Sequence, residues 1–258
     1  MLQFDEATAR ILEDSYHGSD FTRRRRASFD ILSPRRGQTV LDLGCGNGML
    51  TLELARAVGP EGRVIGIDSS QSMLDLAADR CRDRDNVTFH EAGADVLPLE
   101  SNSIDGAVSL QVFEYIDDMT PSLLELARVL RPHAPLAIGD LHFGTWAWHS
   151  DHPERMARMM QSWNRHVASI STPARLPALM QQAGFGNIGC RASAYCDITL
   201  RPDGLPQLMI HVMRNYAIQK GHLPEADVLE WQAEQFELSR SGRFFFSLTH
   251  FVVHGIRI

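Results

Sequence analysis

The chain alternates short apolar runs with amphipathic segments along most of its length. Runs rich in valine, isoleucine and leucine predict strands, and apolar residues that recur every three or four positions predict helices. The predicted strands cover residues 40–43, 63–68, 87–91, 103–110, 136–140, 188–200 and 243–254. The predicted helices cover residues 2–16, 20–32, 49–58, 71–82, 120–130, 151–168, 172–183, 205–220 and 224–238. Strands that alternate with helices in this way predict an α/β fold with a mostly parallel sheet.

A glycine turn joins the first predicted strand to the helix that follows it. Gly44, Gly46 and Gly48 stand directly after the run Val40 to Leu43, and the helical pattern begins at Met49. Glycines at such a turn allow a small ligand to lie against bare backbone at a helix N-terminus. The spacing is G-x-G-x-G, which differs from the G-x-G-x-x-G of dinucleotide-binding proteins.

The second predicted strand ends in a carboxylate. Asp68 closes the run Arg63 to Ile67 and lies twenty residues beyond Gly48. Within one strand-helix-strand unit, an acidic side chain at this distance can accept hydrogen bonds from both hydroxyls of a ribose. The two neighbouring strand ends therefore predict a nucleoside site.

These two motifs resemble those of a known enzyme family. V-L-D-L-G-C-G-N-G followed by V-I-G-I-D-S-S is similar to the first two motifs of class I S-adenosylmethionine-dependent methyltransferases that act on small molecules. The resemblance implies a Rossmann-like sheet of seven mostly parallel strands with an antiparallel last strand. Helices on both faces, and N-terminal and inserted helices that cap the site, complete this expected fold.

The resemblance also implies which residues bind S-adenosylmethionine. Asp42 orients the amino-acid part of the cofactor, and the backbone of the turn approaches it. Asp68 and the following serine hold the ribose, a methionine of the next helix lies beside the adenine, and the end of the fourth strand passes the methionine part. These further positions are Gly44, Cys45, Gly46, Ser69, Met73 and Gln111, the last through its backbone carbonyl.

The chain departs from the family pattern after its third strand. Members of the family usually carry an acidic residue followed by alanine where this chain has Gly93 and Ala94. The acid that normally accepts a hydrogen bond from the adenine amine is therefore missing at position 93. We expect Asp95 or a backbone group to take its place.

Four consecutive arginines lie in the predicted helix 20–32. Residues 23–26 point in four directions on a helix, so at least one guanidinium faces inward toward Phe29 and Leu32. A solvated helix face is the other reading of such a run. In similar methyltransferases an arginine of this helix holds the cofactor carboxylate, and Arg25 is the expected one, with Tyr16 as a nearby residue that binds substrate.

The segment after the fifth strand is rich in histidine and tryptophan. In open α/β sheets ligands bind beyond the carboxyl ends of the strands, so Trp146, Trp148 and His149 are expected to bind the acceptor. His142, with Asp140 two residues before it, is a candidate general base. Buried hydrogen bonding is an equally good reading of this pair. The histidine spacing matches no common zinc pattern, so no metal is expected.

The composition of the chain indicates which kinds of molecule it binds. The chain has 25 basic and 32 acidic residues and a formal charge of −7, which disfavours an enzyme that must follow a phosphate backbone. The N-P-P-Y type motif that binds flipped bases in related enzymes is also absent, so a small-molecule acceptor, not a nucleic acid, is expected. No stretch reaches membrane-spanning length and no C-x-x-C pair occurs, which together predict a cytoplasmic protein with reduced thiols and no membrane partner.

A single methyltransferase domain is expected over residues 1–258. Its parts are an N-terminal helical lid (1–33), a cofactor-binding core (34–140), acceptor-side helices and strand (141–242) and a last sheet strand (243–258). Two alternatives to a methyltransferase stay open. One is a catalytically silent or repurposed cofactor-binding protein, such as a cyclase or regulatory scaffold, because fold does not fix function. The other is an NAD-dependent oxidoreductase.

Overall fold

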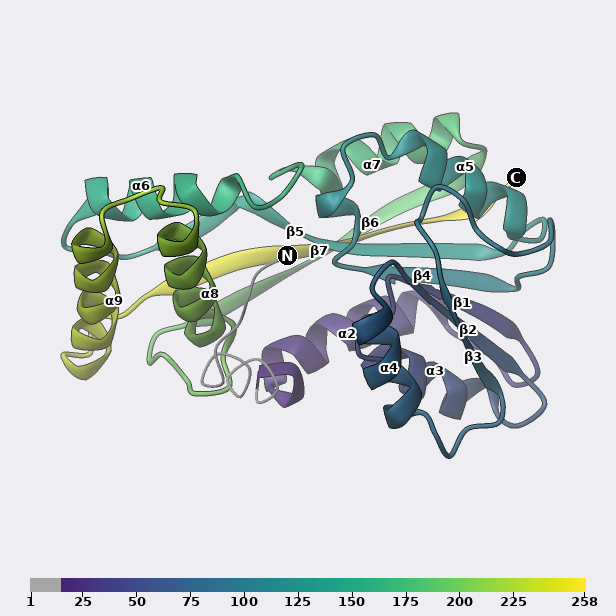
Figure 1. Ribbon diagram of the computed structural model, residues 1–258. Helices are drawn as coiled ribbons and strands as arrows, with labels where there is room; N and C mark the ends of the chain where they lie inside the picture. Colours follow the sequence, from purple (N-terminus) through teal and green to yellow (C-terminus); the bar gives the residue numbers. More distant parts are fainter. Residues whose placement is uncertain (1–14) are drawn as a thin grey trace. The chain divides into compact units, whose positions relative to one another are not determined.

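A computed structural model describes residues 15–258, which form alternating strands and helices (Figure 1). The cofactor-side elements are α2 (Ser19–Leu32), β1 (Thr39–Leu43), α3 (Met49–Val58), β2 (Arg63–Asp68), α4 (Gln71–Arg80), β3 (Val87–Glu91), β4 (Gly106–Leu110), the 3-10 helix η1 (Phe113–Tyr115) and α5 (Thr120–Val129). The later elements are β5 (Pro135–Trp148), α6 (Pro153–Asn164), α7 (Thr172–Gln182), β6 (Phe185–Asp197), α8 (Leu205–Gln219), α9 (Glu225–Arg240) and β7 (Phe246–Arg257). The helix predicted over residues 2–16 falls almost wholly outside the described residues.

The strands of the described chain form one seven-stranded sheet in the order β3-β2-β1-β4-β5-β7-β6. The four pairings β3–β2, β2–β1, β1–β4 and β4–β5 are parallel. The last strand is antiparallel: Arg257 N donates to Ala134 O over 3.0 Å, and Ile258 N donates to Gly184 O over 3.0 Å, so the end of β7 meets the beginnings of β5 and β6. The predicted Rossmann-like fold is confirmed.

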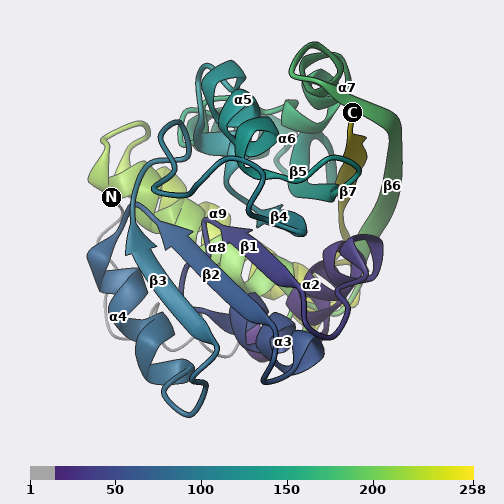
Figure 2. The same ribbon diagram turned by 90° about the vertical axis from the view of Figure 1, so that its right-hand side faces the viewer.

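Two apolar layers cover the two faces of the parallel strands, because successive side chains of a strand point to opposite faces. Val40, Val64 and Val108 pack on one face with α2 and α3. Leu41 and Ile65 belong to the opposite layer, with apolar residues of α5 and α7. Figure 2 shows α3 and α4 on one side of β1, β2 and β3, and α5 and α7 on the other.

Strand β5 is much longer than its sequence suggests. The predicted strand ends at Asp140, whereas β5 continues to Trp148, so the prediction that the histidine- and tryptophan-rich segment lies beyond the strand is wrong. Its backbone pairs with the final strand: His149 N donates to Phe245 O over 2.9 Å. Pairing with a partner about 100 residues later in the chain overrides the local polarity of this segment. The other element boundaries differ from prediction by a few residues.

The chain divides into two compact units. One contains the described residues up to Arg24 together with residues 142–170 and 193–250, and its helices α6, α8 and α9 pack on one another. The other contains residues 25–141, 171–192 and 251–258, which include the parallel strands. Among the described residues, no helix is both long enough and apolar enough to cross a membrane.

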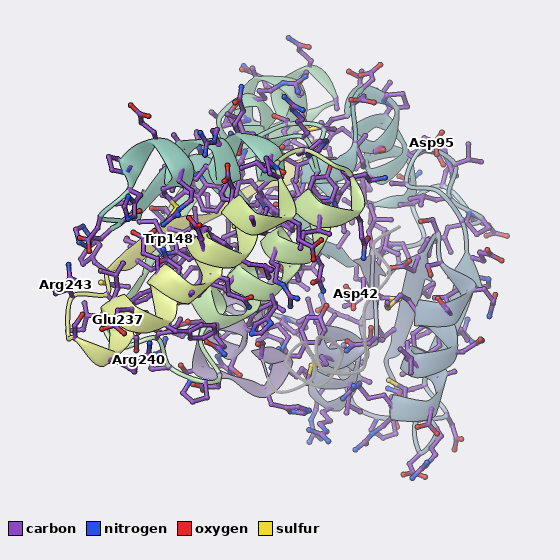
Figure 3. The ribbon with its side chains drawn as sticks, turned by 60° about the vertical axis from the view of Figure 1, so that its left-hand side comes forward. Asp42, Asp95, Trp148, Glu237, Arg240 and Arg243 are labelled. Atoms are coloured by element: carbon purple, nitrogen blue, oxygen red, sulfur yellow. The ribbon has the colours of Figure 1, made fainter. Side chains whose placement is uncertain are left out.

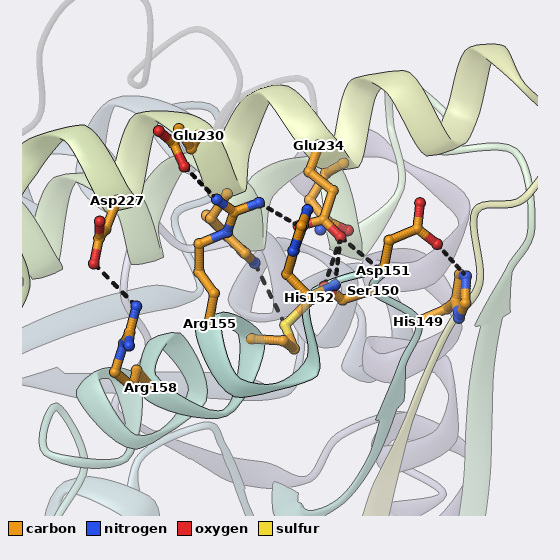
Figure 4. A network of polar contacts seen from close by, with 12 residues as sticks. His149, Ser150, Asp151, His152, Arg155, Arg158, Asp227, Glu230 and Glu234 are labelled. Carbon is orange, nitrogen blue, oxygen red and sulfur yellow. Dashed lines mark hydrogen bonds and ion pairs between the residues drawn. The ribbon is translucent and has the colours of Figure 1, made fainter.

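Glu234 of α9 anchors the beginning of α6 (Figure 4). Its carboxylate accepts hydrogen bonds from Ser150 Oγ over 2.6 Å and from Asp151 N over 2.7 Å, and it forms an ion pair with Arg155 at 3.1 Å. Burial favours the neutral acid, yet these hydrogen bonds outweigh it and hold the pKa of Glu234 below its ordinary value. A side chain of a helix distant in the sequence thus provides the acceptor for donors of the segment that leads into α6.

We expect Glu234→Ala to lower the free energy of unfolding by about 1 kcal/mol at pH 7, because Ser150 Oγ, Asp151 N and Arg155 lose the carboxylate that accepts their hydrogen bonds. A depressed carboxyl pKa stabilises the fold above the unfolded pKa, and this stabilisation is lost as the pH falls through the folded pKa. The difference from wild type therefore shrinks below about pH 4. Urea unfolding at pH 7 and pH 4 measures it.

Glu230→Ala is the matched control for this prediction. Glu230 forms an ion pair with the same Arg155 at 2.6 Å, but its side chain is 67% exposed. Exposed ion pairs contribute little, so we expect a change below about 0.5 kcal/mol. Equal destabilisation by the two variants would show that the ion pair, and not the capping of α6, accounts for the effect.

Candidate functional site

The turn between β1 and α3 has the backbone conformation that glycine permits. Gly44, Gly46 and Gly48 have φ values of 71°, 52° and 79°, in the left-handed region that other residues rarely adopt. The turn is fixed to the neighbouring strand, because Gly44 N and Cys45 N both donate to Ile67 O, over 2.6 Å and 3.0 Å. The first two strand ends are therefore joined directly at the turn.

Val112 packs directly on Gly44. A Cβ atom added to Gly44 would overlap with Cγ2 of Val112. Val112 follows Gln111, which has a left-handed φ of 58° although it is not glycine, and Gln111 N donates to Gly139 O over 2.8 Å. Such strained conformations cost free energy and concentrate at ligand-binding sites. The end of β4 thus turns sharply beside the glycine turn.

Gly46 combines an open position with a charged neighbour. A Cβ atom added there would meet no heavy atom of the described chain within 4 Å. Gly46 N donates to Oδ2 of Asp68 over 2.9 Å, and Ser70 N donates to Oδ1 of the same carboxylate over 3.0 Å. Each carboxylate oxygen keeps a second lone pair. Asp68 is therefore fixed in place and can still accept hydrogen bonds from a vicinal diol.

Asp42 lies beneath the turn and is almost fully buried, with an exposure of 1%. Its Oδ2 accepts a hydrogen bond from Thr51 Oγ1 of α3 over 2.6 Å. Burial raises the pKa of Asp42 to about 7, and the negative charges of Asp68 and Glu53 add to this effect, whereas the hydrogen bond from Thr51 opposes it. Asp42 therefore changes its charge near neutral pH.

The other residues of the predicted cofactor site differ in how far their side chains are exposed to solvent. Cys45 is buried, and burial raises the pKa of its thiol well above the ordinary range, so it stays protonated. Ser69 is exposed after the end of β2, and Met73 of α4 is half-buried. Met73 N donates to Ser70 O over 3.0 Å. These positions leave Ser69 and Met73 accessible to a ligand.

Asp95 occupies the space that an acidic residue at position 93 would enter. Its Oδ1 lies 2.5 Å from the position that a Cβ atom on Gly93 would take, and Asp95 is exposed on its loop. Figure 3 shows Asp95 on a loop apart from the buried Asp42. The carboxylate of Asp95 therefore lies beside position 93, where members of the family usually have an acidic residue.

Two of the four consecutive arginines face inward. Arg24 and Arg25 are 2% and 8% exposed. Nε of Arg25 donates to Oε1 of Glu53 in α3 over 2.9 Å, so the arginine that was expected to bind the cofactor carboxylate has a protein carboxylate as a partner. Arg24 lies over the ring of Phe21, with 4.1 Å between Cζ and the ring centroid.

His142 and Asp140 both lie on β5. Asp140 is fully buried, and His142 is half-buried. Nδ1 of His142 accepts a hydrogen bond from Gly144 N over 3.1 Å, so the neutral ring carries its proton on Nε2. A nitrogen in this state donates a hydrogen bond and does not remove a proton. The predicted role of His142 as a general base stays a prediction.

The aromatic residues predicted to bind the acceptor differ in their surroundings. The ring of Trp148 is buried between Trp231 and Phe246, at centroid distances of 5.8 Å and 4.8 Å, and its Nε1 donates to Gln235 Oε1 over 2.9 Å. This packing is typical of a core residue. Trp146 and Tyr16 are half-buried and His149 is exposed. Their predicted roles stay predictions.

Sequence reasoning missed three residues that shape these sites. They are Thr51, which holds Asp42; Val112, which packs on Gly44; and Arg24, which is more deeply buried than Arg25. The run of arginines indicated that one of them faces inward, but not which. No local signal identifies Thr51 or Val112, because each contact joins different elements of the chain.

Among the described residues, no group of three or more histidine, cysteine, aspartate or glutamate side chains gathers closely enough to hold a metal ion.

The sheet order and the glycine turn bonded to an acidic strand end define a Rossmann-like methyltransferase fold. A family model described as "Methyltransferase domain" matches residues 40–133, which contain the turn, Asp68 and Gln111. Residues 40–133 thus form a methyltransferase domain, within a fold of the class I S-adenosylmethionine-dependent methyltransferase type.

Several known proteins are similar to all or part of this chain. An uncharacterized 37.1 kDa protein in a transposon of Streptomyces fradiae is 33% identical over 233 residues, which are 87% of this chain and 64% of that protein. The 2-phytyl-1,4-naphtoquinone methyltransferase of Trichormus variabilis is 41% identical over 109 residues, covering 41% of this chain and 48% of the enzyme. The crystal structure of the YcgJ protein from Bacillus subtilis superposes with a TM-score of 0.64 and 17% identity, over 92% of this chain and 98% of that one. The chain thus spans between about half and two thirds of the curated relatives it matches.

Proposed function

We propose that the chain transfers a methyl group from S-adenosylmethionine to a small-molecule acceptor. The observation that carries the proposal is the pairing of Gly46 with Asp68: a backbone donor fixes the carboxylate, while the Cα atom of Gly46 faces open space among the described residues. A nucleoside whose ribose binds Asp68 fits this combination. Part of this chain is similar to an enzyme named as a methyltransferase of 2-phytyl-1,4-naphtoquinone, a small molecule. This similarity supports a small-molecule acceptor.

The protein's contribution to such a transfer is chiefly positioning. The sulfonium of the cofactor supplies the methyl group: its S–CH₃ bond breaks, the electron pair stays on sulfur, and a new bond forms to an oxygen, nitrogen or carbon of the acceptor. Holding the acceptor in line with the departing sulfur supplies much of the rate enhancement. Asp68 holds the ribose, Asp95 takes the place of the missing acid toward the adenine, and the Gly44–Gly46 backbone admits the amino-acid part.

Proton removal from the acceptor is a separate requirement. An acceptor that is already ionised needs no base. His142 stays a candidate for contact with the acceptor, and its Nδ1 accepts a hydrogen bond from Gly144 N. Solvent then takes the acceptor proton, and the products are S-adenosylhomocysteine and the methylated acceptor.

The first test of this function is calorimetric titration with S-adenosylmethionine, S-adenosylhomocysteine and NAD. We expect wild type to bind the two sulfur nucleosides and not NAD. Asp68→Ala should weaken S-adenosylhomocysteine binding by about 100-fold, because two charge-assisted hydrogen bonds are lost. Glu91→Gln is the matched control: Glu91 ends the neighbouring strand in register with Asp68, and its change should leave affinity within about twofold.

The outcomes of these titrations separate the candidate functions. Binding of NAD alone would overturn the proposal in favour of an oxidoreductase. Tight binding of S-adenosylhomocysteine with no methylated product from a broad panel of phenols, amines and quinone precursors would instead indicate a repurposed cofactor-binding protein.

A further inference from the structure

The segment that carries Asp95 follows β3 and forms neither helix nor strand over residues 92–99 (Figure 3). Gly93 has no Cβ atom to restrict its backbone, and the side chains of Asp95 and Val96 are exposed, that of Val96 by 70%. Residues of this kind give a free chain many conformations. A carboxylate on such a segment recognises a ligand group well only if the ends of the segment are held in place.

The first end of the segment is bonded to the residue that is predicted to hold the ribose. Ala92 N donates to the backbone oxygen of Asp68 over 3.1 Å, which continues the parallel pairing of β2 with β3 beyond Glu91. The segment therefore starts directly beside the end of β2.

The second end is held by two charged residues of α5. Leu97 N donates to Oε2 of Glu125 over 2.9 Å. Arg128 donates from Nη2 to Leu97 O over 3.0 Å and from Nη1 to Leu99 O over 2.7 Å. Both backbone groups of Leu97 are thus bonded to side chains of one helix, and its own side chain is 4% exposed and belongs to the apolar core.

Glu125 and Arg128 also hold each other. They lie about one turn apart, and the guanidinium donates from Nε to Oε1 over 2.6 Å and from Nη2 to Oε2 over 2.7 Å. The hydrogen bond from Arg128 keeps the pKa of Glu125 below its ordinary value. A bidentate pair of this kind has a fixed geometry as well as a favourable energy. Both residues and the segment 92–99 belong to the same compact unit of the chain.

We propose that Glu125 and Arg128 are positioning residues for cofactor recognition: by holding Leu97, they place the carboxylate of Asp95 where it accepts a hydrogen bond from the amino group of the adenine. Asp95 is two residues from Leu97 in the chain, so a shift of Leu97 moves Asp95 directly. The gap that Asp95 fills at Gly93 leaves little room for such a shift, because Oδ1 lies 2.5 Å from the position of an added Cβ atom. The inference rests on the proposed binding of S-adenosylmethionine and specifies what determines its preference for adenine.

The test compares S-adenosylhomocysteine with its 6-deamino analogue, in which hydrogen replaces the amino group of the adenine. The full chain is titrated calorimetrically with each nucleoside. We expect wild type to bind S-adenosylhomocysteine about tenfold more tightly than the analogue, because the analogue cannot donate to Asp95. Arg128→Met should reduce this preference to about twofold. Glu125→Gln should reduce it less, because the amide oxygen can still accept the hydrogen bond from Leu97 N.

A second helical pair provides the matched control. Glu237 and Arg240 are also three residues apart, at the end of α9, and their side chains are 59% and 70% exposed. Arg240→Met should keep the preference of wild type. Asp95→Ala should reduce the preference at least as far as Arg128→Met does, and the double variant should lose no more than Asp95→Ala, because both changes act on one contact. A further loss in the double variant would overturn the inference, since Arg128 would then act through another group.

Hydrogen exchange and thermal unfolding of the ligand-free protein separate positioning from a purely structural role. Arg128→Met should increase the exchange rate of the amides of residues 93–97 by about tenfold. A lower melting temperature together with an unchanged preference would overturn the inference, as would equal affinity of wild type for the two nucleosides. If wild type binds neither nucleoside, the proposed function fails and the inference fails with it. If wild type shows the preference and Arg128→Met keeps it, the inference alone is wrong.

Discussion

Gly44→Ala is expected to lower the free energy of unfolding by about 3 kcal/mol or more and to abolish cofactor binding. The residue has a φ of 71°, which is unfavourable for alanine, and the added methyl group overlaps with Cγ2 of Val112. Relief requires the turn to move away from β4. The same movement would break the hydrogen bonds from Gly44 N and Cys45 N to Ile67 O, so both strand ends of the site would be disturbed.

Gly46→Ala is the matched control in the same turn. Its φ of 52° carries a similar backbone cost, but its added methyl group meets no heavy atom of the described chain within 4 Å. We expect a loss of only about 1 kcal/mol in stability. The affinity for S-adenosylhomocysteine should nevertheless fall by about tenfold or more, because the methyl group enters the space proposed for the ligand.

Urea unfolding and calorimetric titration of both variants measure these effects. Adding Val112→Ala to Gly44→Ala should restore part of the stability, because Cγ2 is removed and the Cβ of residue 112 stays 3.2 Å away. If Gly46→Ala binds S-adenosylhomocysteine as wild type does, the open side of Gly46 is not where the ligand lies.

Asp42→Asn is expected to make the protein more stable at pH 8 while weakening cofactor binding. The pKa of Asp42 is raised from 3.8 to about 7 by burial, so the folded state holds a proton that the unfolded chain releases. This contribution to stability is present below about pH 4, is lost as the pH rises toward 7, and amounts to about 4 kcal/mol in total. Asparagine does not ionise and can still accept the hydrogen bond from Thr51.

Unfolding in urea at pH 5 and pH 8 tests the sign of this prediction. The stability of Asp42→Asn relative to wild type should increase with pH. Its affinity for S-adenosylhomocysteine at pH 8 should fall by about tenfold, because the predicted role of Asp42 is to hold the cofactor's ammonium group with its negative charge. Asp30→Asn, a change at a side chain that is 43% exposed, should show neither effect. Parallel pH profiles for wild type and Asp42→Asn would mean that Asp42 titrates normally.

The cofactor side of the molecule could be predicted from sequence because its determinants are local. Strand β2 was predicted over the residues it occupies, and the glycine turn and Asp68 lie where a strand-turn-helix pattern puts them. The side chain of Asp95 lies beside Gly93, two residues earlier, and its role toward the adenine stays a prediction. In each case a few consecutive residues determine the backbone conformation, and the backbone conformation determines where the side chain lies.

The acceptor side could not be predicted in the same way. Strand β5 continues past Asp140 because β7 pairs with it, and nothing within residues 141–148 indicates that partner. Trp148 was expected in an acceptor site, but its surroundings come from Trp231 and Phe246, about 80 to 100 residues later. The choice between Arg24 and Arg25 likewise depends on which of them meets Glu53 and which meets Phe21. Tertiary contacts, not propensity, decide these positions.

The division of the chain into two interleaved units has a consequence for the order in which it folds. The parallel sheet needs residues 251–258, and the other unit needs residues up to His250 together with a helix that begins at Ser19. Val252 and Val253 even belong to opposite apolar layers of the same sheet. Neither unit can therefore complete its core before residues 246–258 take their place. We expect deletion of residues 251–258 to leave both units prone to aggregation.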